Sequence, residues 1–189
     1  MLKAFSMKFF FIFILIILTS ISFKSYINSK EDINKYLKNE LHDLELNKEE
    51  KNIYDLVFKN HKGQEVKFSD FKDKILLVNF WATWCTPCIK EMPSLDRLKS
   101  KFDKNFDVIA ISIDRDGLEK VTDFFKENNI VNLNKFFDIK NSLAKEMDLF
   151  GIPTSFFINK KGEIIGKYQG DMEWDNETVV KFIEYLIKI

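Results

Sequence analysis

The chain has only two cysteines among its 189 residues, and both lie in one motif, Cys85-Thr86-Pro87-Cys88. A framework of several disulfides needs more cysteines, so this chain is not a disulfide-rich scaffold. Half a zinc site is also a weak interpretation, because no second C-x-x-C or H-x-x-x-H is present. The two histidines, His42 and His61, stand alone in polar surroundings.

The chain also lacks an excess of charge of either sign, since 29 Lys and Arg residues balance 29 Asp and Glu residues. Nothing in this balance indicates a nucleic-acid partner or a strongly acidic one. Apolar residues make up 46% of the chain, with 20 phenylalanines, which is ample for the core of one domain with a tail.

The N-terminus carries a targeting signal. Lys3 and Lys8 precede an apolar run from Phe9 to Phe23, which Lys24 closes. This run is shorter than the about 20 residues that a spanning helix needs. A signal peptide and a signal anchor therefore both remain open for residues 1–24. We favour an uncleaved anchor, because the run offers only a weak cleavage site. Neither cysteine lies near enough to be a lipid-attachment site.

Residues 25–51 are rich in Lys, Glu and Asn, and a helical stripe of apolar side chains runs through them: Ile33, Tyr36, Leu37, Leu41 and Leu44. This pattern predicts a charged, mostly solvated helical spacer, and the alternatives are a stripe that packs on the domain or lies on the membrane. The folded domain is expected from residue 52 to residue 189.

Strand and helix patterns alternate through this domain, which predicts an α/β fold with a parallel βαβ core. A hairpin is expected first, at 55–59 and 64–68, and an antiparallel strand pair near the end. The remaining expected elements are strands at 75–81, 106–113, 155–159 and 163–169, and helices at 87–102, 118–128, 141–149 and 175–188.

The C-x-x-C motif lies where the apolar run 75–81 gives way to a helical pattern. The amides and the positive dipole end of that helix would stabilise a thiolate at Cys85, lowering its pKa below the usual value of about 8.5. Cys85 is then the attacking sulfur and Cys88 the resolving one. Pro87 is tolerated in a first helical turn. A structural disulfide is the main alternative, but so small a ring stabilises by only about 2 kcal/mol on the loop-entropy model.

The segment F-W-A-T-W-C-T-P-C-I-K-E-M-P, residues 80–93, resembles TlpA/ResA-type thioredoxin-like proteins, and TlpA in particular. These are membrane-tethered thiol-disulfide reductases that face outside the bacterial cytoplasm. Asn79, where cytoplasmic thioredoxins carry Asp, and Glu91 both fit this group. The resemblance implies a thioredoxin-like fold: a central mixed β-sheet flanked by helices, with an extra N-terminal β-hairpin. It also implies a redox-active disulfide between Cys85 and Cys88.

The resemblance extends to the proposed substrate groove. Pro153, in G-I-P-T, resembles the cis-proline that faces the C-x-x-C in this family, although an ordinary trans loop proline is the alternative. Ile152 and Thr154 would then line the groove. Trp84 is interpreted as a lid beside the active site that could contact substrate. Trp81 and Trp174 are interpreted as core residues, with a cap as an alternative for Trp174.

Glu91 follows Cys88 by three residues, so both share one face of the expected helix. A carboxylate held near the buried sulfur can accept its proton during exchange. The alternative is a solvated helix residue. The catalytic interpretation requires that Glu91 be buried and that its pKa be raised.

These residues indicate an extracytoplasmic thiol-disulfide oxidoreductase, catalytic through Cys85, Cys88 and Glu91, without cofactor or metal. The resemblance implies a reductase of apocytochrome c or copper-centre assembly proteins, re-reduced by a membrane electron donor. It also places the protein at the bacterial inner membrane, with its domain facing the periplasm or cell exterior. A DsbA-like oxidase and a copper-binding assembly protein are the alternatives. Against the oxidase, this chain has no helical insertion and no His within its C-x-x-C. Against the copper-binding protein, it has neither a C-x-x-x-C motif nor the distal His that such a site needs.

Overall fold

The computed structural model describes residues 33, 35–37, 41–48 and 51–189. The chain divides into two compact units, Met1–Lys38 and Asn39–Ile189, and the second carries both cysteines. The predicted targeting segment, residues 1–24, and the first part of the predicted spacer lie outside the described residues. No helix within the described part of the chain is both long and apolar enough to cross a membrane.

The second unit is built on a mixed eight-stranded sheet with the order β1-β8-β7-β4-β5-β6-β2-β3. Strands β4, β5 and β6 are parallel to one another, and the other pairs are antiparallel. The described strands are β1 (Glu45–Leu46), β2 (Val57–Asn60), β3 (Glu65–Lys67), β4 (Ile75–Trp81), β5 (Phe106–Ser112), β6 (Phe136–Phe137), β7 (Thr154–Ile158) and β8 (Ile164–Gln169). The predicted α/β class, the mixed sheet and the β2–β3 hairpin are confirmed.

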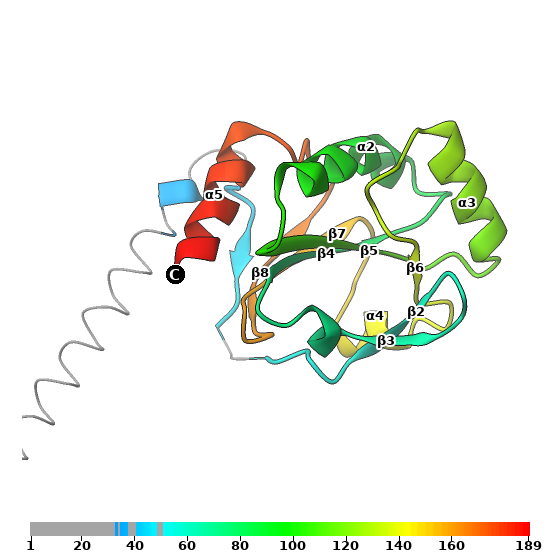
Figure 1. Ribbon diagram of the computed structural model, residues 1–189, viewed down its shortest axis with the longest axis horizontal. Helices are drawn as coiled ribbons and strands as arrows, with labels where there is room; N and C mark the ends of the chain where they lie inside the picture. Colours follow the sequence, from blue (N-terminus) through cyan, green and yellow to red (C-terminus); the bar gives the residue numbers. More distant parts are fainter. Residues whose placement is uncertain (1–32, 34, 38–40, 49–50) are drawn as a thin grey trace, which may run out of the picture. The chain divides into compact units, whose positions relative to one another are not determined.

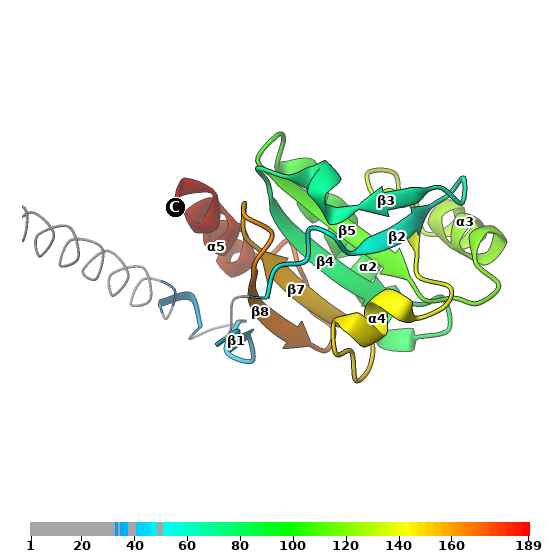
Figure 2. The same cartoon turned by 90° about the horizontal axis from the view of Figure 1, so that it is seen from below.

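Helices cover both faces of this sheet. They are the 3-10 helix η1 (Phe68–Phe71) and the α-helices α2 (Thr86–Lys101), α3 (Leu118–Glu127), α4 (Ser142–Glu146) and α5 (Glu177–Lys188). Helices α2, α3 and α5 lie on one side of the sheet, and α4 and η1 lie on the other (Figure 1). Seen from below, α4 crosses in front of the central strands (Figure 2).

Strand β4 is buried along its whole length, as expected of a central strand with both faces covered. Because side chains alternate along a strand, Leu76, Val78 and Phe80 join the apolar cluster that includes Leu143 of α4. Asn79 points to the opposite face, toward α2. It is the one polar residue of β4, and it is fully buried.

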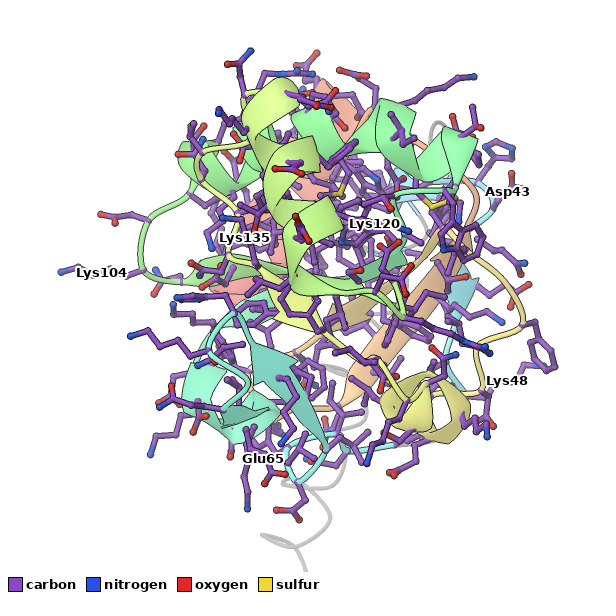
Figure 3. All side chains as sticks on the ribbon, turned by 90° about the vertical axis from the view of Figure 1, so that its right-hand side faces the viewer. Asp43, Lys48, Glu65, Lys104, Lys120 and Lys135 are labelled. Carbon is purple, nitrogen blue, oxygen red and sulfur yellow. A yellow bond between two sulfur atoms is a disulfide. The ribbon has the colours of Figure 1, made fainter. Side chains whose placement is uncertain are left out.

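Charged side chains lie mainly at the periphery of the domain, where Lys104 and Glu65 project outward (Figure 3). Burying a carboxylate is costly unless donors hold it. The buried carboxylates of the described residues are therefore informative: Glu91, Asp96, Asp107, Asp114 and Asp138. Two of them, Glu91 and Asp114, belong to the site described below.

The predicted spacer is wrong at its C-terminal end. Leu41 and Leu44 are buried in the second unit, and Glu45–Leu46 forms β1, which pairs with β8. Gly166 allows this pairing, because a Cβ there would lie 2.9 Å from the carbonyl oxygen of Glu45. Leu41 and Leu44 of the predicted stripe cover a sheet edge and are not helical, and the compact unit begins near residue 39 rather than at 52.

Two further local predictions differ from the structure. The last helix begins at Glu177 with Asn176 as its N-cap, whose Oδ1 accepts from the Val179 N–H at 2.9 Å. Asp175, the expected start, instead pairs with Arg97. The short strand β6 was not predicted, because two consecutive phenylalanines carry no periodicity.

Candidate active site

The two cysteines lie at the junction of β4 and α2. Cys85 is the N-cap of α2, and its sulfur accepts a hydrogen bond from the Cys88 N–H at 3.3 Å. Cys85 and Cys88 form a disulfide. Cys85 keeps 6% of its surface exposed, whereas Cys88 has none. Only Cys85 is therefore open to a partner, and the helix N-terminus can stabilise the thiolate that reduction would leave there.

Pro87 occupies the first turn of α2, as predicted, where its missing N–H breaks no helical hydrogen bond.

Asp114 fastens the loop in front of the cysteines. This buried carboxylate accepts hydrogen bonds from the Thr83 N–H at 2.9 Å, the Thr83 hydroxyl at 2.7 Å and the Ser112 hydroxyl at 2.7 Å. It thereby ties the residues before Cys85 to the end of β5. The sequence prediction missed Asp114, although a polar pair directly after an apolar strand was a usable signal.

Glu91 lies one turn after Cys88 on α2 and is only 1% exposed. Its Oε1 accepts a hydrogen bond from Asn79 Nδ2 at 2.7 Å, and its Oε2 accepts one from Trp174 Nε1 at 2.7 Å. Burial raises the pKa of Glu91 to about 7, against the lowering effect of the bonds from Trp174 and Asn79. The burial and the raised pKa required for a catalytic Glu91 are thus present.

Trp174 was predicted as a core or cap residue, and its bond to Glu91 was missed. It is fully buried and packs against Phe157 and Tyr168. Its backbone N–H also donates to Ser94 Oγ of α2 at 2.9 Å. No local pattern links positions 91 and 174, so only the requirement that a buried carboxylate find donors could have suggested the contact.

The predicted substrate residues separate into exposed and buried ones. Trp84 is 66% exposed and lines a cleft of about 260 Å³ together with the half-buried Ile152 and the strongly exposed Phe150. The Ile152–Pro153 bond is cis, as predicted. Pro153 and Thr154 are buried, and the Thr154 hydroxyl donates to the Gly151 carbonyl at 2.7 Å. Phe150 was not singled out from the sequence.

The described residues include no group of three or more His, Cys, Asp or Glu side chains that could hold a metal ion.

Comparisons with known proteins agree with this geometry. Residues 48–183 match the family model described as Redoxin. The chain is 33% identical over 150 residues to the thiol-disulfide oxidoreductase ResA of Bacillus thuringiensis subsp. konkukian, covering 77% of this chain and 79% of that one. It is 29% identical to ResA of Bacillus subtilis, covering 70% and 72%.

Solved structures give the same picture. A protein from Chlorobium tepidum, named as a putative thiol:disulfide interchange protein DsbE, superposes with a TM-score of 0.64 at 25% identity, covering 73% of this chain and 96% of that one. StoA from Bacillus subtilis superposes with a TM-score of 0.55 at 27% identity, covering 69% and 94%.

The TlpA/ResA-type assignment made from the sequence is confirmed, but the similar proteins are named ResA and do not support a particular closeness to TlpA. The chain belongs to the Redoxin family, as a ResA/TlpA-like thiol-disulfide oxidoreductase with the C-x-x-C pair Cys85 and Cys88.

Proposed function

We propose that the protein reduces disulfides in client proteins outside the cytoplasm, with Cys85 as the attacking sulfur and Cys88 as the resolving one. The observation that carries this order is the difference between the two sulfurs. Cys85 is the partly exposed N-cap of α2 and accepts a backbone N–H, whereas Cys88 is fully buried.

The reaction has two exchange steps. The Cys85 thiolate attacks one sulfur of the client disulfide, which forms a Cys85–client disulfide and releases the other client sulfur as a thiolate. Cys88 then loses its proton and attacks Cys85 Sγ, which closes the Cys85–Cys88 disulfide and releases the second client thiolate. Two electrons pass from the dithiol to the client, and the client thiolates take up protons. The Cys85–Cys88 disulfide of the structure corresponds to the product of these two steps.

Glu91 is the proposed proton acceptor for Cys88. It lies one helical turn away on the same buried side of α2. Burial raises its pKa to about 7, close to the neutral pH at which a proton acceptor works best. A solvated glutamate, ionised throughout this pH range, would be a much weaker base.

Trp84, Ile152 and Phe150 are proposed to contact the client segment that carries the disulfide. All three line the cleft of about 260 Å³, and Trp84 directly precedes Cys85. Pro153 and Thr154 are buried and do not line this cleft. Their proposed part is to shape the loop at Gly151 and Ile152, since the Thr154 hydroxyl donates to the Gly151 carbonyl.

The clients proposed from the family resemblance are apocytochrome c and copper-centre assembly proteins. The apolar residues 9–23 would anchor the chain in the bacterial inner membrane, with the domain facing the periplasm or the cell exterior. A membrane electron donor would restore the dithiol. The domain division, with residues 1–24 as the targeting segment, is part of this proposal, and its spacer ends before residue 41.

The reduction potential separates a reductase from an oxidase. The full chain in detergent would be equilibrated with dithiothreitol or glutathione buffers and its oxidised fraction measured. We expect a midpoint nearer the roughly −270 mV of thioredoxin than the roughly −120 mV of DsbA, because no cation lies between the cysteines to stabilise the reduced form further. A midpoint near −120 mV with rapid oxidation of a dithiol client would favour the oxidase.

Clients can be identified with Cys88→Ser, which lacks the resolving sulfur and should stay joined to its client as a mixed disulfide. The Cys85→Ser variant is the matched control, because it should join none. Recovery of c-type cytochromes that carry C-x-x-C-H motifs would support the proposed clients, and their consistent absence among trapped proteins would oppose them.

A further inference from the structure

The Glu91 carboxylate is held by two N–H groups that come from distant parts of the chain. Asn79 of β4 donates to Oε1, and Trp174, in the segment between β8 and α5, donates to Oε2, both at 2.7 Å. We propose that Asn79 and Trp174 are positioning residues of the redox reaction, which keep Glu91 as a carboxylate beside Cys88. This inference rests on the proposed role of Glu91 as proton acceptor.

Electrostatics give the reason why such donors are needed. Burial favours the neutral carboxylic acid, which cannot accept a proton from Cys88. Donors to the ionised form counter that effect, and both N–H groups lower the pKa that burial raises. With burial as the largest effect and these bonds opposing it, the pKa of Glu91 is about 7, so part of the Glu91 population is ionised at neutral pH.

The other groups around Glu91 do not replace these donors. Asp171 raises the pKa of Glu91 by charge repulsion, and a backbone hydrogen bond from Met172 lowers it less than Trp174 and Asn79 do. Tyr168 is a neutral neighbour, and burial raises its own pKa. Arg97, also on α2, is paired with Asp175 and Glu173 at the surface.

Asn79 is oriented for this contact by the strand next to it. Its Nδ2 group uses one hydrogen on Glu91 and the other on Ser155 Oγ of β7, at 3.0 Å. Positions 79 and 155 are paired in the register of β4 and β7. Oδ1 of Asn79 is buried without a partner among the described residues. The Nδ2 group of Asn79 therefore donates to Glu91, while its Oδ1 has no hydrogen bond from the part of the chain that the structure describes. An apolar residue at this position would avoid the cost of that unpaired oxygen.

Trp174 is fixed from two sides. Its ring packs against Phe157 and Tyr168, with centroids 6.2 Å and 5.6 Å away. Its backbone N–H is bonded to Ser94 of α2, three residues after Glu91. The indole N–H is thereby aimed at the carboxylate.

The test is a titration of Glu91 in the oxidised full chain, by NMR of its ¹³C-labelled carboxyl group. The signal is assigned by its loss in Glu91→Gln. Cysteines in a disulfide do not titrate, so this measurement does not depend on any step of exchange. Trp174→Phe removes the indole donor, and the Glu91 pKa should rise by about one pH unit.

Trp81→Phe is the matched control. Trp81 is also a buried tryptophan, 1% exposed, but its Nε1 has no hydrogen-bond partner among the described residues. Its substitution should leave the Glu91 pKa unchanged. Asn79→Leu, which removes the other donor at similar size, should raise that pKa as Trp174→Phe does. An unchanged Glu91 pKa in both folded variants would overturn the inference.

A measurement on the unaltered protein covers the case in which these variants fail to fold. The indole N–H resonance of Trp174 should shift with pH at the Glu91 midpoint, and that shift should vanish in Glu91→Gln. A Trp174 resonance that stays constant through this range would contradict the hydrogen bond. The kinetics decide the proposed function separately: unchanged client reduction by Glu91→Gln would remove the proton-acceptor role, whatever the titration of Glu91 shows.

Discussion

The two faces of the central strands differ in chemistry. Toward α4 and η1, side chains such as Val78, Phe80 and Phe156 form a continuous apolar cluster. Toward α2, the same strands present Asn79 and Ser155, which join the hydrogen-bonded group around Glu91. Burying polar groups costs free energy, and these polar groups lie on the side of the sheet where α2 carries Cys88.

The largest expected effect lies on the α2 face and concerns activity. Cys85→Ser should reduce client-disulfide reduction to the background rate, because a hydroxyl is not a useful nucleophile toward disulfides. Insulin reduction by the reduced full chain measures this. Val78→Ala, on the opposite face, is the comparison variant and should keep most activity. Substantial turnover by Cys85→Ser would show that Cys85 is not the attacking sulfur.

The second prediction concerns the apolar face and stability. Phe80 is fully buried and packs edge-on against Phe156. Phe80→Ala should lower the free energy of unfolding by about 3–5 kcal/mol, through lost burial and the cavity it leaves. Denaturant unfolding of the oxidised protein measures the loss, and the ¹³C titration of Glu91 should keep its midpoint. A shifted midpoint would mean that the two faces are not independent.

The third prediction follows from the pKa of Glu91, raised from 4.5 to about 7 by burial. Between these values the folded protein holds a proton that the unfolded chain has lost. The free energy of unfolding should therefore fall as pH rises through this window, by up to about 3 kcal/mol from this group. Unfolding curves from pH 4 to 8 measure the fall, and Glu91→Gln should remove that part of it. An equal slope in both proteins would argue against the raised pKa.

The smallest expected effect lies outside both faces, at the cleft beside Trp84. Phe150 is 87% exposed, so Phe150→Ala should leave the free energy of unfolding within about 0.5 kcal/mol. It should weaken capture of a client a few-fold, seen as a higher KM with an unchanged kcat. Val131→Ala is the control, because Val131 is 79% exposed and is not among the residues lining this cleft. Equal effects from both variants would remove the cleft from the client surface.

Local patterns were sufficient for much of the fold. The buried strand 75–81, the helix after it and the final strand pair follow from periodicity and turn residues, and the structure has each within a few residues. The spacer shows where this reasoning stops. Leu41 and Leu44 fit a helical stripe, but the free edge of β8 offered their segment backbone partners, and a two-residue strand formed instead.

The sequence by itself determined the redox pair. A C-x-x-C motif at the start of a helix is enough to make Cys85 and Cys88 differ in reactivity. It also determined that Glu91 shares the helical face of Cys88, since three residues make almost one turn. The tertiary structure decided the ionisation of that carboxylate. Its donors lie 12 and 83 residues away in the chain and meet it only when β4, α2 and the segment before α5 pack together. Burial and hydrogen bonding, which set a pKa, are properties of that packing and not of any local pattern.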